Sequence, residues 1–145
     1  MGTLLLVAAL VGCGDDGGTT DQPRTEEPEP ELVQMIVITS AGGEVSPAAY
    51  FVDERDQMKA YVKTFEDRGD VAAELQQAAK AAEDREGRLA VATVAVGCDV
   101  PPGVSITEGA DGPEVHPEKV VDPKQECFAA TTSIALVEIP TGNPE

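Results

Sequence analysis

The chain has 145 residues and a formal net charge of -17, from 27 acidic and 10 basic side chains. Such an acidic surface repels phosphate backbones and anionic headgroups within a Debye length, so the composition argues against nucleic acid as a partner. Aromatic residues make up only 3% of the chain and Trp is absent, so a core must be built mainly from Val, Ala, Ile and Leu. The length suits one domain.

The chain begins with a short apolar run from Leu4 to Val11. Its length is typical of the hydrophobic region of a signal peptide, whereas a helix that crosses the hydrocarbon core needs about 20 apolar residues. Alternatively, the run forms a buried first strand or helix, but the Gly-Asp-Asp-Gly-Gly segment that starts at Gly14 would cut that element short. The pattern therefore predicts a signal peptide over residues 1–12.

The apolar run ends in Leu10-Val11-Gly12-Cys13, which resembles the lipobox of bacterial lipoprotein precursors. The resemblance implies that residues 1–12 are removed and that Cys13, as the new amino terminus, is thioether-linked to diacylglycerol. Two acyl chains hold a protein stably at a membrane, at roughly 0.8 kcal/mol per buried methylene, whereas one chain holds it only marginally. The resemblance thus predicts a protein lipid-anchored to the bacterial cell membrane that faces the periplasm or the cell exterior.

The segment after the cysteine, from Gly14 to Glu31, contains no aliphatic or aromatic side chain. Such a segment cannot offset its ordering entropy by burial, so we expect residues 13–31 to be a disordered acidic tether. Its reach lies between that of a flexible coil and that of an extended spacer, roughly 20 to 55 Å. It can serve as a spacer from the membrane, as a solubilising tail, or as both.

A single α+β domain is expected over residues 32–141, with a C-terminal tail over 142–145. Residues 32–39 are rich in branched side chains and are followed by a Ser-Ala-Gly-Gly turn, which is typical of a strand. Residues 44–52 are ambiguous because Pro47 argues against a central strand.

Two amphipathic helices are expected next. In the first, over about 54–67, Asp53 can serve as the N-cap and apolar side chains recur at i, i+3, i+4 and i+7. These apolar residues are Met58, Tyr61, Val62 and Phe65. Arg68-Gly69 is expected to break the helix, and Asp70 to cap a second helix that runs to about Arg85 and stops at Gly87.

Strands are expected in the second half of the chain. Residues 88–96 are apolar on both alternating faces apart from Thr93, as in a central strand covered on both sides. Shorter strands over 103–107 and 114–121 are expected to flank a hairpin turn at 109–112, and a last strand covers 128–139. This order predicts two helices packed on one side of a mainly antiparallel sheet of about four to five strands.

The chain has three cysteines. If Cys13 carries lipid, Cys98 and Cys127 remain as a pair in an exported, oxidising setting, which favours a disulfide. No Cys-x-x-Cys spacing is present for redox chemistry or zinc binding, and a single His cannot complete the usual zinc ligand set. We therefore interpret this pair as structural.

The sequence predicts no catalytic residue, metal site or cofactor. A Ser-His-acid triad would have to use His116, which lies beside Pro117 and is interpreted as a solvated strand-edge residue. The Gly42-Gly43 pair lacks the Lys and the helix pattern of a phosphate loop. Five acidic residues near the predicted hairpin favour a solvated acidic face over a calcium site, because their spacing matches no calcium loop. They are Asp99, Glu108, Asp111, Glu114 and Glu118.

Two functional hypotheses follow. The first is a membrane-anchored envelope lipoprotein that acts as a non-enzymatic binding or interaction module, with a basic envelope protein as a possible partner because the chain is so acidic. The alternative is an envelope hydrolase or a cation-binding protein that uses surface carboxylates. No further family resemblance for the mature domain emerges from the sequence.

Overall fold

The computed structural model describes residues 28–142. The predicted signal peptide, the lipobox-like sequence with Cys13 and the predicted tether up to residue 27 lie outside the described residues, as do residues 143–145 of the predicted tail. The described part is an α+β fold with two helices and antiparallel sheets, as predicted. None of its helices is both long enough and apolar enough to cross a membrane. The elements are β1 (Glu31–Thr39), β2 (Tyr50–Phe51), α1 (Arg55–Val62), α2 (Arg68–Ala81), β3 (Arg88–Gly97), β4 (Val104–Gly109), β5 (Gly112–Pro117) and β6 (Thr131–Ile139).

Four strands form the main sheet in the order β1-β6-β3-β2, and every neighbouring pair is antiparallel. β3 lies between β6 and β2, which confirms the predicted central strand. β1 starts at Glu31, one residue before the predicted boundary, because Glu31 already pairs with Glu138. β6 starts at Thr131 rather than at residue 128, because Thr131 is the first residue paired with both of its neighbouring strands.

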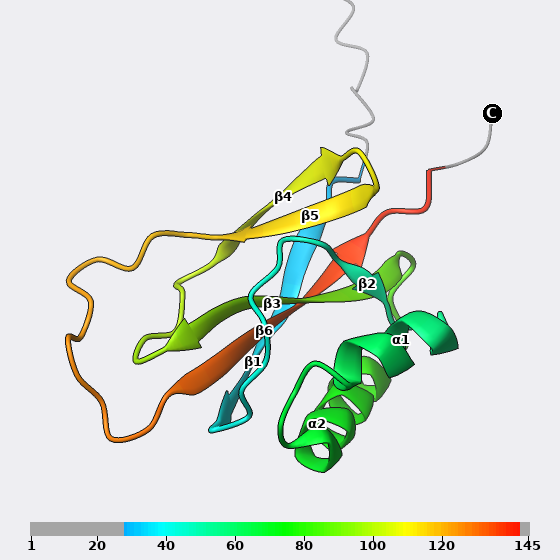
Figure 1. The fold of residues 1–145 in the computed structure, drawn as a ribbon. Helices are drawn as coiled ribbons and strands as arrows, with labels where there is room; N and C mark the ends of the chain where they lie inside the picture. Colours follow the sequence, from blue (N-terminus) through cyan, green and yellow to red (C-terminus); the bar gives the residue numbers. More distant parts are fainter. Residues whose placement is uncertain (1–27, 143–145) are drawn as a thin grey trace, which may run out of the picture.

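The main sheet is covered on both faces, as Figure 1 shows. α1 and α2 lie on one face, where they bury a core with β1, β3 and β6. The β4–β5 hairpin covers the opposite face and buries a second, smaller core. The side chains of β3 alternate between the two cores, Val91 toward the helices and its neighbours Ala90 and Ala92 toward the hairpin. This alternation explains why β3 is apolar at almost every position.

The hairpin differs from the prediction because it forms a separate two-stranded sheet and does not extend the main one. Its strands cover Val104–Gly109 and Gly112–Pro117 instead of 103–107 and 114–121. Backbone hydrogen bonds tie it to the segment before β2: the amide of Val115 donates to the carbonyl of Pro47 at 2.7 Å, and that of Ala49 to the carbonyl of Pro113 at 3.1 Å. The ambiguous segment at 44–52 thus holds the hairpin against the sheet.

α1 ends at Val62, five residues before the predicted end at residue 67. The amide of Phe65 donates to the carbonyl of Val62 at 3.3 Å, a tighter bonding pattern that ends the helix. The amide of Glu66 then donates to the carbonyl of Ala41 at 3.0 Å, in the loop after β1. Phe65 therefore reaches the core from a turn and not from the last turn of a helix.

α2 begins earlier and ends earlier than predicted. Its N-cap is Asp67, whose carboxylate accepts a hydrogen bond from the amide of Asp70 at 3.2 Å. Asp70 is therefore a residue of the first turn, where its charge favours the helix, and not the cap. Gly69 lies inside this first turn, so the predicted break at Arg68-Gly69 is wrong. The helix stops at Ala81, four residues before the predicted end at Arg85.

A hydrogen bond between Tyr61 and Thr93 joins α1 to the centre of the sheet, with the two hydroxyl oxygens 2.8 Å apart in a buried site. Burial raises the pKa of Tyr61 well above its ordinary value, so the hydroxyl stays protonated. We expect Tyr61→Phe to lower the free energy of unfolding by about 1 to 3 kcal/mol, because the Thr93 hydroxyl loses its partner. Urea unfolding measures the effect. Tyr61→Phe combined with Thr93→Val should cost less than the sum of the two single changes, and strict additivity would contradict the prediction.

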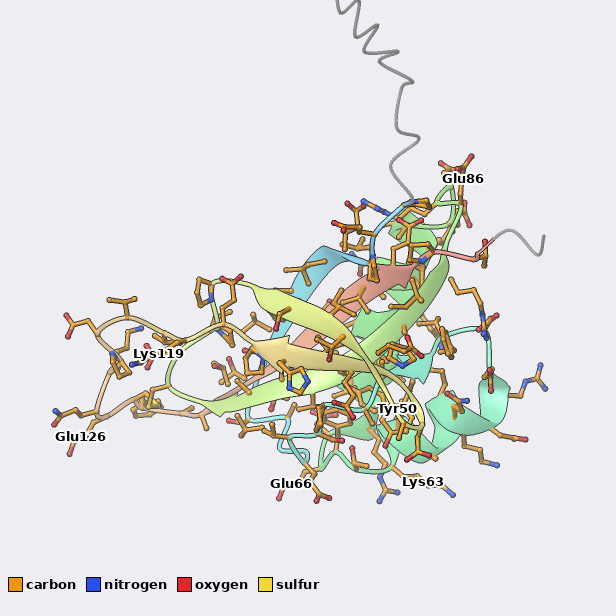
Figure 2. The ribbon with its side chains drawn as sticks, turned by 90° about the horizontal axis from the view of Figure 1, so that it is seen from above. Tyr50, Lys63, Glu66, Glu86, Lys119 and Glu126 are labelled. Atoms are coloured by element: carbon orange, nitrogen blue, oxygen red, sulfur yellow. A yellow bond between two sulfur atoms is a disulfide. The ribbon has the colours of Figure 1, made fainter. Side chains whose placement is uncertain are left out.

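The chain enters the domain at one end of the main sheet, and the long connection between β5 and β6 lies at the other. Glu31 pairs with Glu138 at the first end, and Thr39 pairs with Thr131 at the second. Figure 2 shows the same separation, with Glu86 at one end of the molecule and with Lys119 and Glu126 on the connection at the other end. At about 3.3 Å per residue, β1 separates these two ends by roughly 25 Å.

Candidate functional site

A groove of about 660 Å³ lies between α1, α2 and the turn that precedes α1. The two helices lie side by side on the same face of the sheet, as Figure 1 shows. Six apolar side chains line the groove, three from the α1 side and three from α2. They are Val52, Met58, Val62, Ala72, Leu75 and Ala79. This size and this apolar lining are typical of small-molecule sites.

The groove follows from the spacing of the apolar residues. Met58 and Val62 lie four residues apart on one side of α1, and Ala72, Leu75 and Ala79 lie three and then four residues apart on one side of α2. Leu75 is buried in the core, whereas Ala72 and Ala79 are half-buried. The two alanines have short side chains and leave open space, so the floor of the groove is continuous with the core below it.

Three basic side chains on the α1 side also line the groove: Arg55, Lys59 and Lys63. They recur every four residues, so they form one row along α1 and its C-cap. We call this row the basic rim. All three are exposed, and none forms an ion pair with another described residue. The basic rim holds three of the 10 basic residues in a chain of net charge -17.

Asp53 is the acidic residue of the groove lining, and its charge is already paired. Its carboxylate accepts two hydrogen bonds from the Arg88 guanidinium, at 2.8 and 3.1 Å, and this interaction lowers the pKa of Asp53. The prediction that Asp53 is the N-cap of α1 is wrong, because Glu54 has that position. Arg88 also stacks on Phe51, 3.8 Å from the ring centre. The charges left without a partner in the groove are thus positive.

The residues of the predicted acidic face are all exposed or half-buried. Asp99 accepts a hydrogen bond from the amide of Lys124 at 2.9 Å, so it braces a loop. Glu108 and Asp111 are exposed on the hairpin, and the amide of Glu118 donates to the carbonyl of Gly103 at 2.9 Å. Within residues 28–142, no group of three or more His, Cys, Asp and Glu side chains is arranged to hold a metal ion.

His116 lies on β5, with its Nε2 3.3 Å from a carboxylate oxygen of Glu114. Ser105 is its cross-strand partner on β4, so a serine, a histidine and an acid share one face of the hairpin. That face points to solvent: the side chains of His116 and Glu114 are 44% and 40% exposed. An exposed pair of this kind contributes little energy, and no hydrogen bond joins Ser105 to His116. We therefore derive no catalytic step from this face.

The predicted disulfide between Cys98 and Cys127 is confirmed. Their Cα atoms are 5.4 Å apart, an ordinary separation for a disulfide. The bridge fixes the β5–β6 connection to the end of β3. Two large apolar residues of this connection, Val121 and Phe128, have exposed fractions of 88% and 107%. Neither of them lines the groove.

An acid-sensitive contact closes the end of the sheet where the chain enters. Glu138 pairs with Arg85 and accepts a hydrogen bond from the amide of Gly87 at 2.6 Å. The Arg85 pairing, followed by the Gly87 bond, lowers the pKa of Glu138 in the folded state. The contact therefore stabilises the fold fully above the unfolded pKa, about 4.3, and the stabilisation is lost as the pH falls through the lower folded pKa.

We expect Glu138→Gln to reduce the free energy of unfolding at pH 7, and the difference from the wild type to shrink as the pH is lowered below about 4. Urea unfolding at pH 7, 5 and 3 measures this difference. Glu126→Gln, an exposed residue of the β5–β6 connection, is the matched control and should show almost no difference at any pH. A Glu138→Gln effect of constant size from pH 7 to pH 3 would contradict the prediction.

Comparison of the chain with family models, with curated proteins and with solved structures found no match. The groove is therefore defined by its own geometry alone. The sequence pattern alone does not indicate the groove, because the spacing of Met58 and Val62 predicts only part of a core stripe. The available signal was the four-residue spacing of Arg55, Lys59 and Lys63 beside that stripe.

Proposed function

We propose that this protein is a lipid-anchored lipoprotein of the bacterial cell envelope, held through Cys13, and that its domain is a non-enzymatic binding module. The observation that carries the binding role is the groove between α1 and α2, which combines an apolar floor with a row of charges. Ligand sites commonly have this composition, with a few polar groups that orient a largely apolar ligand. The groove contains charged and amide side chains that suit binding, not a nucleophile next to a base.

The described part has β1 at the edge of the main sheet, beginning at Glu31, so the predicted tether would join this edge to an anchor at Cys13. A disulfide suits this address, because such bonds persist in oxidising compartments outside the cytoplasm.

The net charge of -17 favours a basic protein partner that contacts the surface outside the groove. Outside the basic rim, the surface is dominated by Asp and Glu side chains, which attract basic proteins and speed their association at low salt. A basic envelope protein is therefore the protein partner that we propose, alongside the membrane itself. The groove, with its opposite charge, is a separate site for another kind of ligand.

Binding of a neutral apolar dye, Nile red, tests whether the groove is a binding site. The protein is the chain from residue 13 onward with Cys13→Ser, which keeps every described element and needs no detergent. Ala72→Phe places a ring in the groove, whereas Ala73→Phe places the same ring on an exposed position of α2. We expect saturable binding to the parent protein, at least about tenfold weaker binding to Ala72→Phe, and less than about twofold change for Ala73→Phe.

Thermal unfolding of both variants shows whether each remains folded. Equal dye binding by the parent protein and by the two folded variants would contradict the proposed binding role of the groove. Absence of saturable binding to the parent protein would contradict it as well.

A further inference from the structure

We propose that the groove binds the anion of a free, single-chain fatty acid. The acyl chain lies on the floor formed by Met58, Leu75 and Ala79, and the carboxylate pairs with the basic rim. This inference rests on the proposed function, because it names the ligand of the same groove. It follows from three features of the described residues: the charge of the rim, the length of the rim and the apolar floor of the groove.

The basic rim is unfavourable for the protein without a ligand. Like charges four residues apart on a helix repel each other, and Arg55–Lys59 and Lys59–Lys63 are two such pairs. Arg55 also lies in the first turn of α1, where the helix dipole disfavours a cation. Since none of the three has an ion-pair partner among residues 28–142, an anionic ligand would relieve this repulsion.

The length of the basic rim matches one acyl chain of medium length. From Arg55 to Lys63 the rim spans eight helical steps, roughly 12 Å at about 1.5 Å per residue. An extended hydrocarbon chain advances about 1.3 Å per carbon, given carbon–carbon bonds of about 1.5 Å, so about nine or ten carbons fill this length. A fatty acid of ten carbons therefore places its chain on the floor and its carboxylate at one end of the rim.

The same features favour a free fatty acid over a membrane lipid. Beyond the rim, the net charge of -17 repels an anionic bilayer surface, whereas a single small anion needs only the local positive row. The two sources of an anionic acyl chain can be separated by experiment.

Isothermal titration of the Cys13→Ser chain with octanoate, decanoate, dodecanoate and decanol tests the ligand class. We expect the dissociation constant to fall about two- to fourfold for each added methylene up to ten carbons and then to level off. Decanoate should bind at least about tenfold more tightly than decanol. Affinity independent of chain length, or equal affinity for decanol, would overturn the proposal.

A pair of charge-reversal variants tests the rim. Lys59→Glu should weaken decanoate binding at least about tenfold, and thermal unfolding shows whether this variant remains folded. Lys80→Glu is the control, since it makes the same charge change on an exposed position of α2 outside the groove, and it should change the affinity for decanoate and for Nile red less than about twofold. Equal effects of the two variants on decanoate would overturn the assignment of the rim.

Cosedimentation with phosphatidylglycerol vesicles tests whether the basic rim binds an anionic bilayer instead of a free fatty acid. We expect no cosedimentation of the Cys13→Ser chain with them. Vesicle binding that Lys59→Glu removes, without binding of decanoate, would overturn the proposal and assign the rim to a bilayer surface. Nile red binding blocked by Ala72→Phe, with no preference for decanoate over decanol, would overturn the ligand class but leave the proposed binding module intact. Failure of Nile red to bind would contradict both.

Discussion

Replacing Cys98 and Cys127 together by alanine is expected to lower the free energy of unfolding by about 3 to 4 kcal/mol. The two cysteines are 29 residues apart in the sequence, and closing a loop of that length removes chain entropy of about this size from the unfolded state. The loop contains the β4–β5 hairpin, which buries the second core against the sheet. For a domain of this length, the loss corresponds to a decrease of roughly 10 to 25 °C in Tm.

Thermal and urea unfolding of the double alanine variant measure this loss. The control is the parent chain with its disulfide reduced, which should show a loss of similar size because both changes open the same loop. A variant as stable as the oxidised parent would contradict the structural role of the bridge.

Phe65→Ala is expected to lower the free energy of unfolding by about 3 to 5 kcal/mol, the second large effect. Phe65 is only 2% exposed and packs edge-on against Tyr61, with ring centres 5.1 Å apart. Its ring also lies against the backbone at Gly43, where a Cβ atom would stand 2.7 Å from it. Removing the ring leaves a cavity beside this backbone. The backbone at Gly43 has a φ of +100°, so we expect it not to move into the cavity.

Phe128→Ala is the matched control for Phe65→Ala. Its side chain has an exposed fraction of 107%, so the same chemical change should alter the free energy of unfolding by no more than about 0.5 kcal/mol. Urea unfolding of the two variants side by side measures both. Similar losses for Phe65→Ala and Phe128→Ala would contradict the description of the core.

The sequence predicted the elements well where one local pattern dominates. The apolar run of β3 indicated a strand covered on both faces, and the two helical stripes indicated helices on one side of a sheet. The disulfide was predictable because two cysteines remained once Cys13 was assigned to lipid. These features depend on side chains that are neighbours in the sequence or on simple counting.

The helix ends and the position of the hairpin were not predictable, because long-range contacts decide them. α1 stops at Val62 since the amide of Glu66 bonds to Ala41, in a loop 25 residues earlier. The hairpin lies across the sheet since Pro47 accepts the amide hydrogen of Val115, and nothing near either residue indicates this pairing. The groove depends in the same way on the packing of α1 against α2.

The mass of the mature protein, purified from the envelopes of its native host, tests the central claim most directly. Mass spectrometry of the intact protein and of its N-terminal peptide should show a chain that begins at Cys13 and carries diacylglycerol on the cysteine sulfur. The Cys13→Ser variant should lose this added mass and leave the membrane fraction. Recovery of a chain that retains residues 1–12, or of a Cys13 sulfur without lipid, would contradict the proposed anchoring.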